Sequence, residues 1–343
     1  MKVNRESFLR TLESVQPGTS LREILEQSSC FVFQDGQAMT FNEEIACRAP
    51  TGLDKTIVGA VPSNPLLETL RKRPEDEVEI EIDGPIFIVG GKGRRTEFNM
   101  EAEISLPIGM VETPKTWKKL HEEFCDAIAT VGACASQDQT QFAYTCVHVH
   151  PKWVEASDNN QVCRWRLQTG VEESVLVRQT SIKHVPPLGM TEFTETKSWL
   201  HFRNPNGLIL SCRRYIEEYR SFGEFLKTEG SPIVLPKGLI EACERCLVFT
   251  GELKDANLVT VRLSPGKLSI IGVGISGRHR EARKIAWEGN TIEFSISPVL
   301  LSEIVKKHND CQMTAEPLRV KNDRFTFVAC LNPVESREEV GAT

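Results

Sequence analysis

Apolar residues recur at helical spacing in three long segments of the chain, and each segment begins a similar series of elements. The segments are RESFLRTLESV from Arg5, PKTWKKLHEEFCDAI from Pro114 and PKGLIEACERCLVF from Pro236. Each predicts an amphipathic helix, because apolar side chains three and four residues apart form one stripe. Runs that alternate apolar and polar residues follow each helix and predict strands. The layout therefore repeats about every 110–120 residues.

A second helix is expected within the first and last repeats. SNPLLETLRKR from Ser63 and SPVLLSEIVKKH from Ser297 have similar patterns, and an alternating strand, a turn and a closing strand follow each of them. Ser63 or Asn64 is the candidate N-cap of the first. The equivalent helix of the middle repeat, near SIKHVPPLG, should be short because Pro186 and Pro187 cannot continue a helix.

These repeats predict an α+β protein of three domains. We place them at residues 1–110, 111–230 and 231–336, with a flexible tail at 337–343. Hydrophobic residues make up 40% of the 343 positions, which is ordinary for a soluble globular protein. The formal net charge of −6 taken alone argues against nucleic-acid binding. Whether the protein binds nucleic acid depends, however, on where its charges lie.

Cysteine usage and the lack of apolar runs indicate a cytoplasmic protein. The eleven cysteines are scattered and show no disulfide framework, so we expect reduced, mostly buried thiols. The sequence shows no basic segment followed by an apolar core at its start, and no apolar run of membrane-spanning length.

Three short motifs could carry chemistry, but each also has a structural interpretation. GVGISG, with Gly272, Gly274 and Gly277, matches a dinucleotide fingerprint, which requires a helix directly after it. RHREARKIAW follows instead and alternates like a strand, so a glycine-rich hairpin is favoured.

The other two motifs concern cysteine and histidine. Cys146, His148 and His150 would share one face of a strand and form the best zinc candidate, although a fourth ligand is not evident. Cys243 and Cys246 fall inside an amphipathic helix, where their spacing places both near the core. The sequence has no nucleophile elbow, phosphate-binding loop or H-E-x-x-H motif. We expect no catalytic residue, no metal and no cofactor.

Lysine and arginine recur beside the apolar stripes of the predicted helices. On one helix such residues usually form a solvated surface, but their recurrence in equivalent places of a repeat favours a shared role. These cations are Arg5, Arg10, Arg71, Lys72, Arg73, Lys115, Lys118, Lys119, Lys237, Arg245, Lys306 and Lys307. The strand EVEIEID instead has an acidic side, formed by Glu77, Glu79 and Glu81. If helices line one surface and sheets the opposite one, the protein is basic on one side and acidic on the other.

The order of these segments resembles the bacterial DNA polymerase III beta subunit, the sliding clamp. The resemblance covers nearly the whole chain. It is clearest in MKVNRESFLRTLESV, in VPSNPLLETLRKRPEDEVEIEIDGPIFIVGGKGRRTEF, and in the last third from PKGLIEACERCLVF through LVTVRLSPGKLSIIGV and GNTIEFSISPVLLSEIVKK to FTFVACLNP. It implies three DNA-clamp domains, with antiparallel sheets outside and helices lining a central channel.

The resemblance also implies a function without chemistry. Two chains would form a head-to-tail homodimeric ring around double-stranded DNA, and the helix cations would face phosphate without reading sequence. DNA polymerase and clamp-loader subunits would bind through short peptides. The alternatives are a diverged paralogue that serves a specialised, phage or mobile-element polymerase, or a metal- or dinucleotide-dependent enzyme.

Binding residues carry over from the family position by position. The family motif A-T-D-G-H-R-L corresponds here to ASDNNQV from Ala156, so the Ala and Asp persist while Gly, His and Arg are replaced. The implied peptide groove comprises Tyr144, Asn160, Gln161, Val162, Ile182, Leu331 and Pro333. A conserved proline of the family corresponds to Arg178. At the subunit interface, Thr96 and Phe98 would meet Val248 and Phe249 of the next chain, although the same four could equally be core residues.

Overall fold

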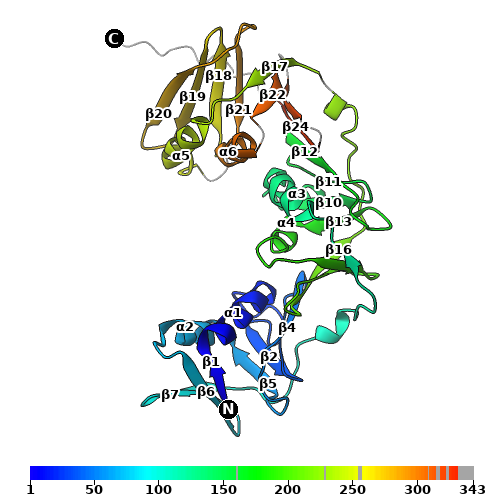
Figure 1. The fold of residues 1–343 in the computed structure, drawn as a ribbon, viewed down its shortest axis with the longest axis vertical. Coiled ribbons are helices and arrows are strands. Elements are labelled where there is room, and N and C mark those ends of the chain that lie inside the picture. The colour runs from blue at the N-terminus through cyan, green and yellow to red at the C-terminus, as the bar shows by residue number, and fades with distance from the viewer. Residues whose placement is uncertain are drawn as a thin grey trace. The chain divides into compact units, whose positions relative to one another are not determined.

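The computed structural model describes residues 1–159, 161–227, 229–253, 257–307, 309–313, 317–321 and 324–330, which form two compact units. Unit 1 comprises Met1–Ile128, Val149–Pro151 and Thr169–Glu217, and unit 2 comprises Ala129–His148, Lys152–Gln168 and Glu218–Thr343. The middle repeat therefore contributes to both units (Figure 1). In the part of the chain that is described, no helix is long and apolar enough to cross a membrane.

Unit 1 contains a four-stranded antiparallel sheet in the order β1-β6-β7-β8. Its strands are β1 (Lys2–Asn4), β6 (Glu77–Asp83), β7 (Ile86–Gly91) and β8 (Arg94–Asn99). The alternation predicted for β6 is confirmed, since Val78 and Ile80 are each 1% exposed while the glutamates between them are exposed. Only Ile82, at 39% exposure, departs from the pattern.

Two helices pack against one another in unit 1, α1 (Arg5–Val15) and α2 (Ser63–Lys72). The Asn4 side chain caps α1 by accepting a hydrogen bond from the backbone N–H of Ser7, at 2.9 Å. The cap predicted for α2 is wrong. Pro62 holds the N-cap position, and the Ser63 hydroxyl instead donates to the carbonyl of Ser29, at 2.6 Å.

The second sheet of unit 1 joins strands from the first and middle repeats. Its main path is β13 (Val175–Arg178), β16 (Ile209–Tyr215), β4 (Ile45–Pro50), β3 (Gln37–Phe41), β2 (Cys30–Gln34) and β5 (Gly59–Pro62). Further strands extend it from β16: β15 (Trp199–Arg203), β14 (Glu192–Glu195) and β9 (Lys118–Lys119). The link between the repeats is the antiparallel pairing of β16 with β4, in which Ile209 lies opposite Arg48.

The middle repeat departs from the predicted helices in two places. The short second helix is confirmed as α4 (Gln179–Ile182). The long helix predicted from Pro114 is wrong, because residues 112–117 are irregular, β9 pairs with β14, and α3 spans only Phe124–Val131. The Trp117 ring lies 4.4 Å from the guanidinium of Arg203, so strand pairing and this cation–π contact outweigh the helical pattern.

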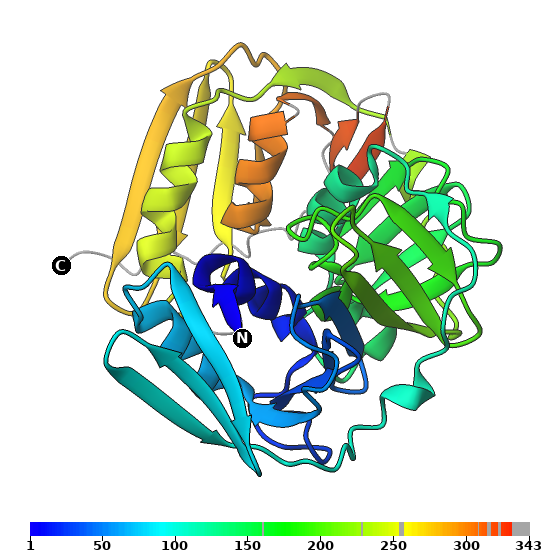
Figure 2. The ribbon, with the colours of Figure 1, turned by 60° about the horizontal axis from the view of Figure 1, so that its bottom comes forward.

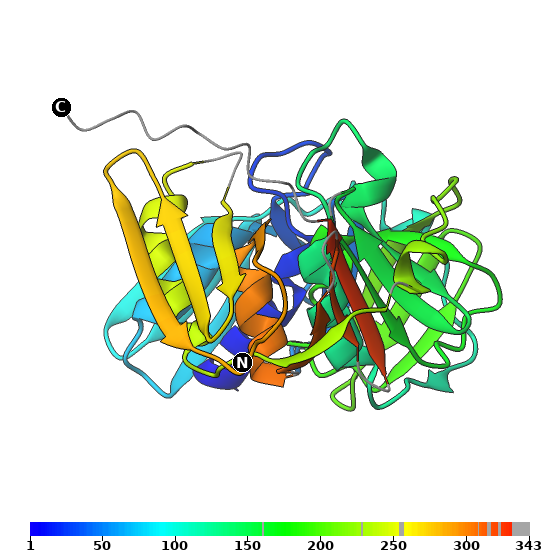
Figure 3. The ribbon, with the colours of Figure 1, turned by 90° about the horizontal axis from the view of Figure 1, so that it is seen from above.

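In unit 2, a four-stranded antiparallel sheet carries two helices on one face (Figures 2 and 3). The strand order is β20 (Arg278–Lys284), β19 (Lys267–Val273), β18 (Val259–Ser264) and β21 (Ile292–Ile296). The helices are α5 (Leu239–Thr250) and α6 (Pro298–Lys307), and they pack side by side. Gly272 allows α5 to lie close to the sheet, because a Cβ there would be 2.7 Å from the Cβ of Cys246.

The other sheet of unit 2 joins strands of the last and middle repeats. It runs through β17 (Ser231–Val234), β22 (Asp310–Met313), β23 (Pro317–Lys321), β24 (Phe325–Cys330), β12 (Gln161–Arg166) and β11 (Trp153–Ser157). The link between the repeats is the pairing of β24 with β12, where Val162 lies opposite Val328. The remaining strand, β10 (Cys146–His150), spans the division between the units.

Candidate nucleic-acid and peptide-binding surfaces

The exposed cations of α1 and α2 are paired with carboxylates on the same helices. Arg10 contacts Glu6 one turn away. Arg71 contacts Glu13 at 2.9 Å and Glu68 at 3.0 Å, and these two carboxylates raise its pKa. Lys72 also lies 3.3 Å from Glu68. Such exposed pairs hold their partners weakly, by about 0–1 kcal/mol, so an anion of higher charge density can compete for the cations.

Two other cations of this set make hydrogen bonds that support the fold. Arg5 donates from Nε to the carbonyl of Glu75, at 2.8 Å, and from a terminal nitrogen to the carbonyl of Leu70 near the end of α2, at 3.3 Å. Helix C-termini leave such carbonyls without partners, which explains the contact. Arg73 is 7% exposed and donates to Thr96 Oγ1 at 3.0 Å. The burial of Arg73 corrects its assignment to a DNA-facing surface. For the half-buried Arg5 that assignment stays a prediction.

The cations of the middle repeat do not form a helix face. Lys118 and Lys119 form the edge strand β9, and Lys115 precedes it in an irregular segment. All three side chains are exposed. Lys118 Nζ lies 3.8 Å from Glu172 Oε1.

In unit 2, the predicted cations lie on or beside α5 and α6. Lys237 is exposed directly before α5. Arg245 of α5 makes two contacts with Glu281 Oε2 of β20, at 2.7 and 3.0 Å. Lys306 of α6 lies 3.1 Å from Glu303. The side chain of Lys307 lies outside the described residues.

The helix surfaces are consequently close to neutral. The formal charge of α1 is zero, α2 and α6 carry +1 each, and α5 carries −1, so the four helices together carry +1. Electrostatic attraction of these helices to a polyanion must therefore come from a few cations that leave their carboxylate partners for the polyanion. This attraction should weaken steeply as the salt concentration rises.

The outer faces of the two four-stranded sheets have opposite charge. On β6, Glu77, Glu79 and Glu81 form the acidic face that the sequence predicts. In unit 2 the face turned away from α5 is basic instead, so the expectation of acidic outer strands is wrong there. Its exposed cations are Arg262, Lys267, Arg278, Arg280 and Lys284.

An aromatic cluster in unit 2 includes two residues that the sequence assigned to the peptide groove. Its buried members are Val162, Phe222, Leu226 and Val328, and the half-buried Tyr144, Tyr219 and Phe225 pack against them. Tyr144 and Tyr219 meet edge to face, with ring centroids 6.2 Å apart. Val162 and Tyr144 were predicted for this groove. The segment from Tyr219 to Leu226 was missed, and its signal is the recurrence of aromatic residues in EYRSFGEFL.

The remaining groove residues are divided. Gln161 lies beside the cluster, and its backbone N–H and its Nε2 donate to the two carboxylate oxygens of Asp158, at 3.0 and 2.9 Å. Asn159 has a positive φ of 74°, a conformation that asparagine tolerates better than most residues. Ile182 is fully buried in α4, in unit 1. Asn160, Leu331 and Pro333 lie outside the described residues.

A buried ion pair joins β12, which carries Val162, to the neighbouring strand β11. Glu155 on β11 is 1% exposed, and its Oε2 accepts a hydrogen bond from Arg164 Nε of β12, at 2.6 Å. The guanidinium also lies 4.5 Å from the Trp153 ring centroid. Burial raises the pKa of Glu155, and the guanidinium of Arg164 offsets part of this rise.

The four candidate interface residues differ in exposure. Phe98 is 7% exposed, and its ring packs 6.4 Å from that of Phe87 in the core of unit 1, so its assignment to an exposed interface is corrected. Thr96 is half-buried and accepts the hydrogen bond from Arg73. Val248 on α5 is 68% exposed, and Phe249 beside it is half-buried.

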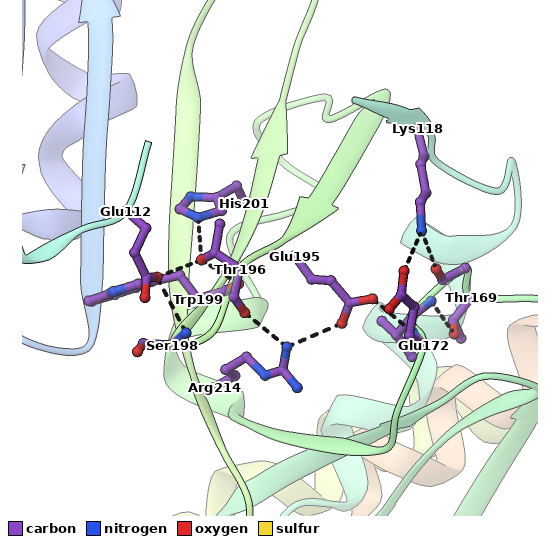
Figure 4. Close-up of polar contacts among 12 residues, drawn as sticks. Glu112, Lys118, Thr169, Glu172, Glu195, Thr196, Ser198, Trp199, His201 and Arg214 are labelled. Atoms are coloured by element: carbon purple, nitrogen blue, oxygen red, sulfur yellow. Dashed lines mark hydrogen bonds and ion pairs between the residues drawn. The ribbon is translucent and has the colours of Figure 1, made fainter. Parts of the chain in front are cut away.

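A buried polar network in unit 1 could be mistaken for a catalytic constellation (Figure 4). His201 Nδ1 lies 2.7 Å from Ser211 Oγ, and its Nε2 lies 3.0 Å from Thr196 Oγ1. Thr196 donates to Glu112 Oε2 at 2.6 Å, so the imidazole must donate from Nε2 and accept from Ser211. His201 is 0% and Ser211 3% exposed, which closes both to a substrate. The network instead ties the segment of Glu112 to β15 and β16.

The pKa of His201 makes this network sensitive to acid. Burial lowers its pKa from 6.5 to about 4, although Glu112 opposes the shift. Between these values the unfolded chain binds a proton that the folded chain does not, so stability present above pH 6.5 is lost as the pH falls. We expect a loss of about 2 kcal/mol between pH 7 and pH 5 from this residue. Urea unfolding at both pH values should show a smaller loss for His201→Gln, and equal losses in the two proteins would contradict the assignment.

Two of the three chemical motifs have structural roles. GVGISG connects β19 to β20, with the N–H of Gly274 donating to the carbonyl of Gly277 at 2.8 Å, which confirms the hairpin. Cys243 and Cys246 are fully buried in α5, and burial raises the pKa of Cys243 to about 11. Among the described residues, no group of three or more His, Cys, Asp or Glu side chains could hold a metal ion.

Comparison with solved structures identifies the fold. No protein family and no curated protein matches the sequence. The DNA polymerase III beta subunit of Thermotoga maritima matches 97% of this chain and 99% of its own, with a TM-score of 0.76 and 13% identity. The beta chain from Streptococcus pneumoniae matches with the same coverage and TM-score at 15% identity. The sliding clamp of Bacillus subtilis covers 97% of this chain and 98% of its own, with a TM-score of 0.73 and 14% identity.

The chain therefore has the sliding-clamp fold over nearly its whole length. In particular, its fold is that of the bacterial DNA polymerase III beta subunit, as the resemblance in the sequence predicted.

Proposed function

We propose that this protein is a non-catalytic DNA sliding clamp. Two chains form a head-to-tail ring of six domains, three from each chain at 1–110, 111–230 and 231–336, and the ring encloses duplex DNA. DNA polymerase and clamp-loader subunits bind its outside through short peptides. The observation that carries the proposal is the match of nearly the entire chain to solved DNA polymerase III beta subunits.

Helices with so little net charge fit a ring that holds DNA by enclosing it. They fit less well a surface that holds DNA by strong electrostatic binding. A closed ring stays on DNA through topology, so each contact can be weak and still allow sliding. The helix cations that remain exposed, among them Arg71 and Lys72, give sequence-independent attraction to phosphate. The protein would act in the cytoplasm, as its reduced cysteines indicate.

Retention on circular DNA tests the ring. The purified protein is loaded onto nicked circular DNA by the matching clamp loader, and half of the sample is then linearised. We expect the protein to stay with the circle and to slide off the linear form. Equal retention on the two forms would reject encirclement, and light scattering of the free protein should give the mass of two chains.

Charge reversal at the exposed cations of α2 tests whether this helix faces the channel. Arg71→Glu/Lys72→Glu should shorten retention on circular DNA several-fold, because attraction at two phosphate contacts becomes repulsion. Arg73 is left unchanged because it is buried. Arg22→Glu/Lys55→Glu, which reverses two exposed cations away from the helices, is the matched control. Equal retention by all three proteins would show that α2 does not face the DNA.

The aromatic cluster should bind the client peptides. Phe222→Ala opens the buried part of the cluster and should weaken a polymerase-derived peptide by tenfold or more, as loss of a central aromatic contact usually does. Fluorescence anisotropy with a labelled peptide measures this, and light scattering should show unchanged assembly. Val248→Ala, which is also in unit 2 but exposed on α5, is the control. Unchanged peptide affinity in Phe222→Ala would show that the peptide groove lies elsewhere.

A diverged paralogue that serves a specialised, phage or mobile-element polymerase is the second candidate. The observation that favours it is the replacement of Gly, His and Arg in the groove motif by Asn159, Asn160 and Gln161. A paralogue of this kind should prefer its own polymerase's peptide to one taken from a clamp that keeps A-T-D-G-H-R-L.

A further inference from the structure

One aromatic side chain of the cluster in unit 2 has a buried hydroxyl group without a partner. The Oη atom of Tyr219 is buried, and no hydrogen-bond partner for it lies among the residues that the structure describes. Burial raises the pKa of Tyr219, and the negative charge of Glu155 adds to the rise, so the hydroxyl keeps its proton at neutral pH. A buried donor that goes unused costs stability, and native proteins seldom keep one without a functional reason.

The ring of Tyr219 lies among three others, as the aromatic side chain of a bound peptide would. It meets Tyr144 and Phe222 edge to face, with ring centroids 6.2 and 5.9 Å apart, and the centroid of the His148 ring is 4.6 Å away. In the same cluster Val162, which the sequence assigned to the peptide groove, is 0% exposed. A client could therefore touch Val162 only after a covering side chain moves.

Tyr219 is attached to the rest of the chain more weakly than the Tyr144 ring beside it. The remaining residues of 217–221 are exposed, and no backbone hydrogen bond joins 217–221 to the rest of the described chain. In contrast, the N–H of Tyr144 donates to the carbonyl of Gln141, at 3.0 Å, and its carbonyl accepts from the N–H of Ser136, at 2.8 Å. Segments with few hydrogen bonds and few buried contacts are the first to open locally.

We propose that Tyr219 is a gate that occupies part of the client-peptide groove while no client is bound. Its ring fills the place that an apolar side chain of the client takes, and client binding swings the ring out together with residues 217–221. Phe222 stays as a wall of the groove, because its carbonyl accepts a hydrogen bond from the N–H of Leu226, at 3.0 Å. The inference rests on the proposed clamp function, since it concerns the regulation of that same groove.

The unpartnered hydroxyl sets how easily the gate opens. In the closed state the Oη of Tyr219 has no partner among the described residues, whereas in the open state water can bind it. The closed state is therefore less stable than it would be with a phenyl ring at the same place. Because only the open state binds a client, the apparent affinity is proportional to the fraction of chains that are open.

Two substitutions of Tyr219 should change client affinity in opposite directions. Tyr219→Phe removes the unpartnered hydroxyl and stabilises the closed gate, so a labelled polymerase-derived peptide should bind about fivefold more weakly or worse. Tyr219→Ala removes the ring and should strengthen binding by a similar factor. Tyr215→Phe in unit 1 is the matched control, because its hydroxyl donates to Glu44 Oε1 at 2.7 Å. That variant should lose stability and keep its affinity. Fluorescence anisotropy measures affinity, and urea unfolding measures stability.

Trypsin cleavage after Arg220 reports the gate without a client. Arg220 is exposed, but a protease must take a stretch of extended chain into its active site, so cleavage should follow the open population. We expect slower cleavage in Tyr219→Phe and faster cleavage in Tyr219→Ala, with mass spectrometry locating the cut. Tyr219→Phe needs no repacking, so it decides the question even if the alanine variant does not fold.

Opposite shifts in affinity, with matching shifts in cleavage, support the gate. Weaker binding by Tyr219→Ala would mean that the ring itself contacts the client, and equal affinity in all the proteins would mean that the ring does not restrict the groove. Either result overturns the proposal. So does a Tyr219→Phe protein that is less stable than the unsubstituted chain, because the hydroxyl would then have a partner. If no protein binds the peptide, the proposed function fails and cleavage alone decides the gate: opposite shifts support it, and equal rates overturn it.

Discussion

Phe98→Asp is expected to unfold unit 1, not to separate two folded subunits. The Phe98 ring is 7% exposed and packs on Phe87, which stacks on Phe33 with centroids 5.4 Å apart. Aspartate there would remove aromatic packing worth about 3–5 kcal/mol and would bury a charge without a partner. Circular dichroism and thermal unfolding should show lost structure or a sharply lowered melting temperature.

Val248→Asp is the matched control for this prediction. Val248 is 68% exposed, so the same charge at that position should leave the fold intact. If α5 contributes to the joint of the proposed ring, this variant should be a folded monomer by light scattering. A folded, monomeric Phe98→Asp would contradict the first expectation and return Phe98 to the interface.

Arg164→Leu should destabilise unit 2 by about 3–5 kcal/mol, because it leaves Glu155 buried without its counter-ion. The effect should shrink at low pH, since the pKa of the Glu155 carboxyl, already raised by burial, would rise further without the cation. Urea unfolding at pH 7 and pH 5 measures both effects. Arg10→Leu, which breaks an exposed pair, should cost less than about 1 kcal/mol.

The double variant separates two effects of Arg164→Leu, the loss of the counter-ion of Glu155 and the loss of packing. Glu155→Met/Arg164→Leu replaces the pair with apolar side chains of similar size and should recover most of the stability. A double variant that is no more stable than Arg164→Leu would show that contact with Trp153 matters more than charge compensation.

The sequence predicts local elements well wherever one periodicity dominates. The stripe of Phe8, Leu12 and Val15 gives α1, and the alternation from Glu77 gives β6. The pattern from Trp117 to Val131 fails because its later apolar residues form α3 while Lys118 and Lys119 pair with β14. The spacing of apolar residues shows which side chains can be buried together. It does not show whether the edge of another strand lies nearby for pairing.

The candidate sites are predicted less completely for a physical reason. Arg5, Arg71 and Arg73 look alike in the sequence, yet one binds backbone carbonyls, one is exposed and one is buried. Long basic side chains reach whichever acceptor the fold brings near, so their roles depend on tertiary contacts. The groove shows the same limit, because Val162 and Phe222 are distant in the sequence and meet only in the folded unit.

The pairing of β24 with β12 means that the middle and last repeats cannot be separated cleanly. A fragment ending near residue 230 would keep β12 but lose β24, which exposes a row of unpaired backbone groups along β12. An uncovered edge of this kind recruits other strands. Fragments cut at the repeat boundaries should therefore be aggregation-prone.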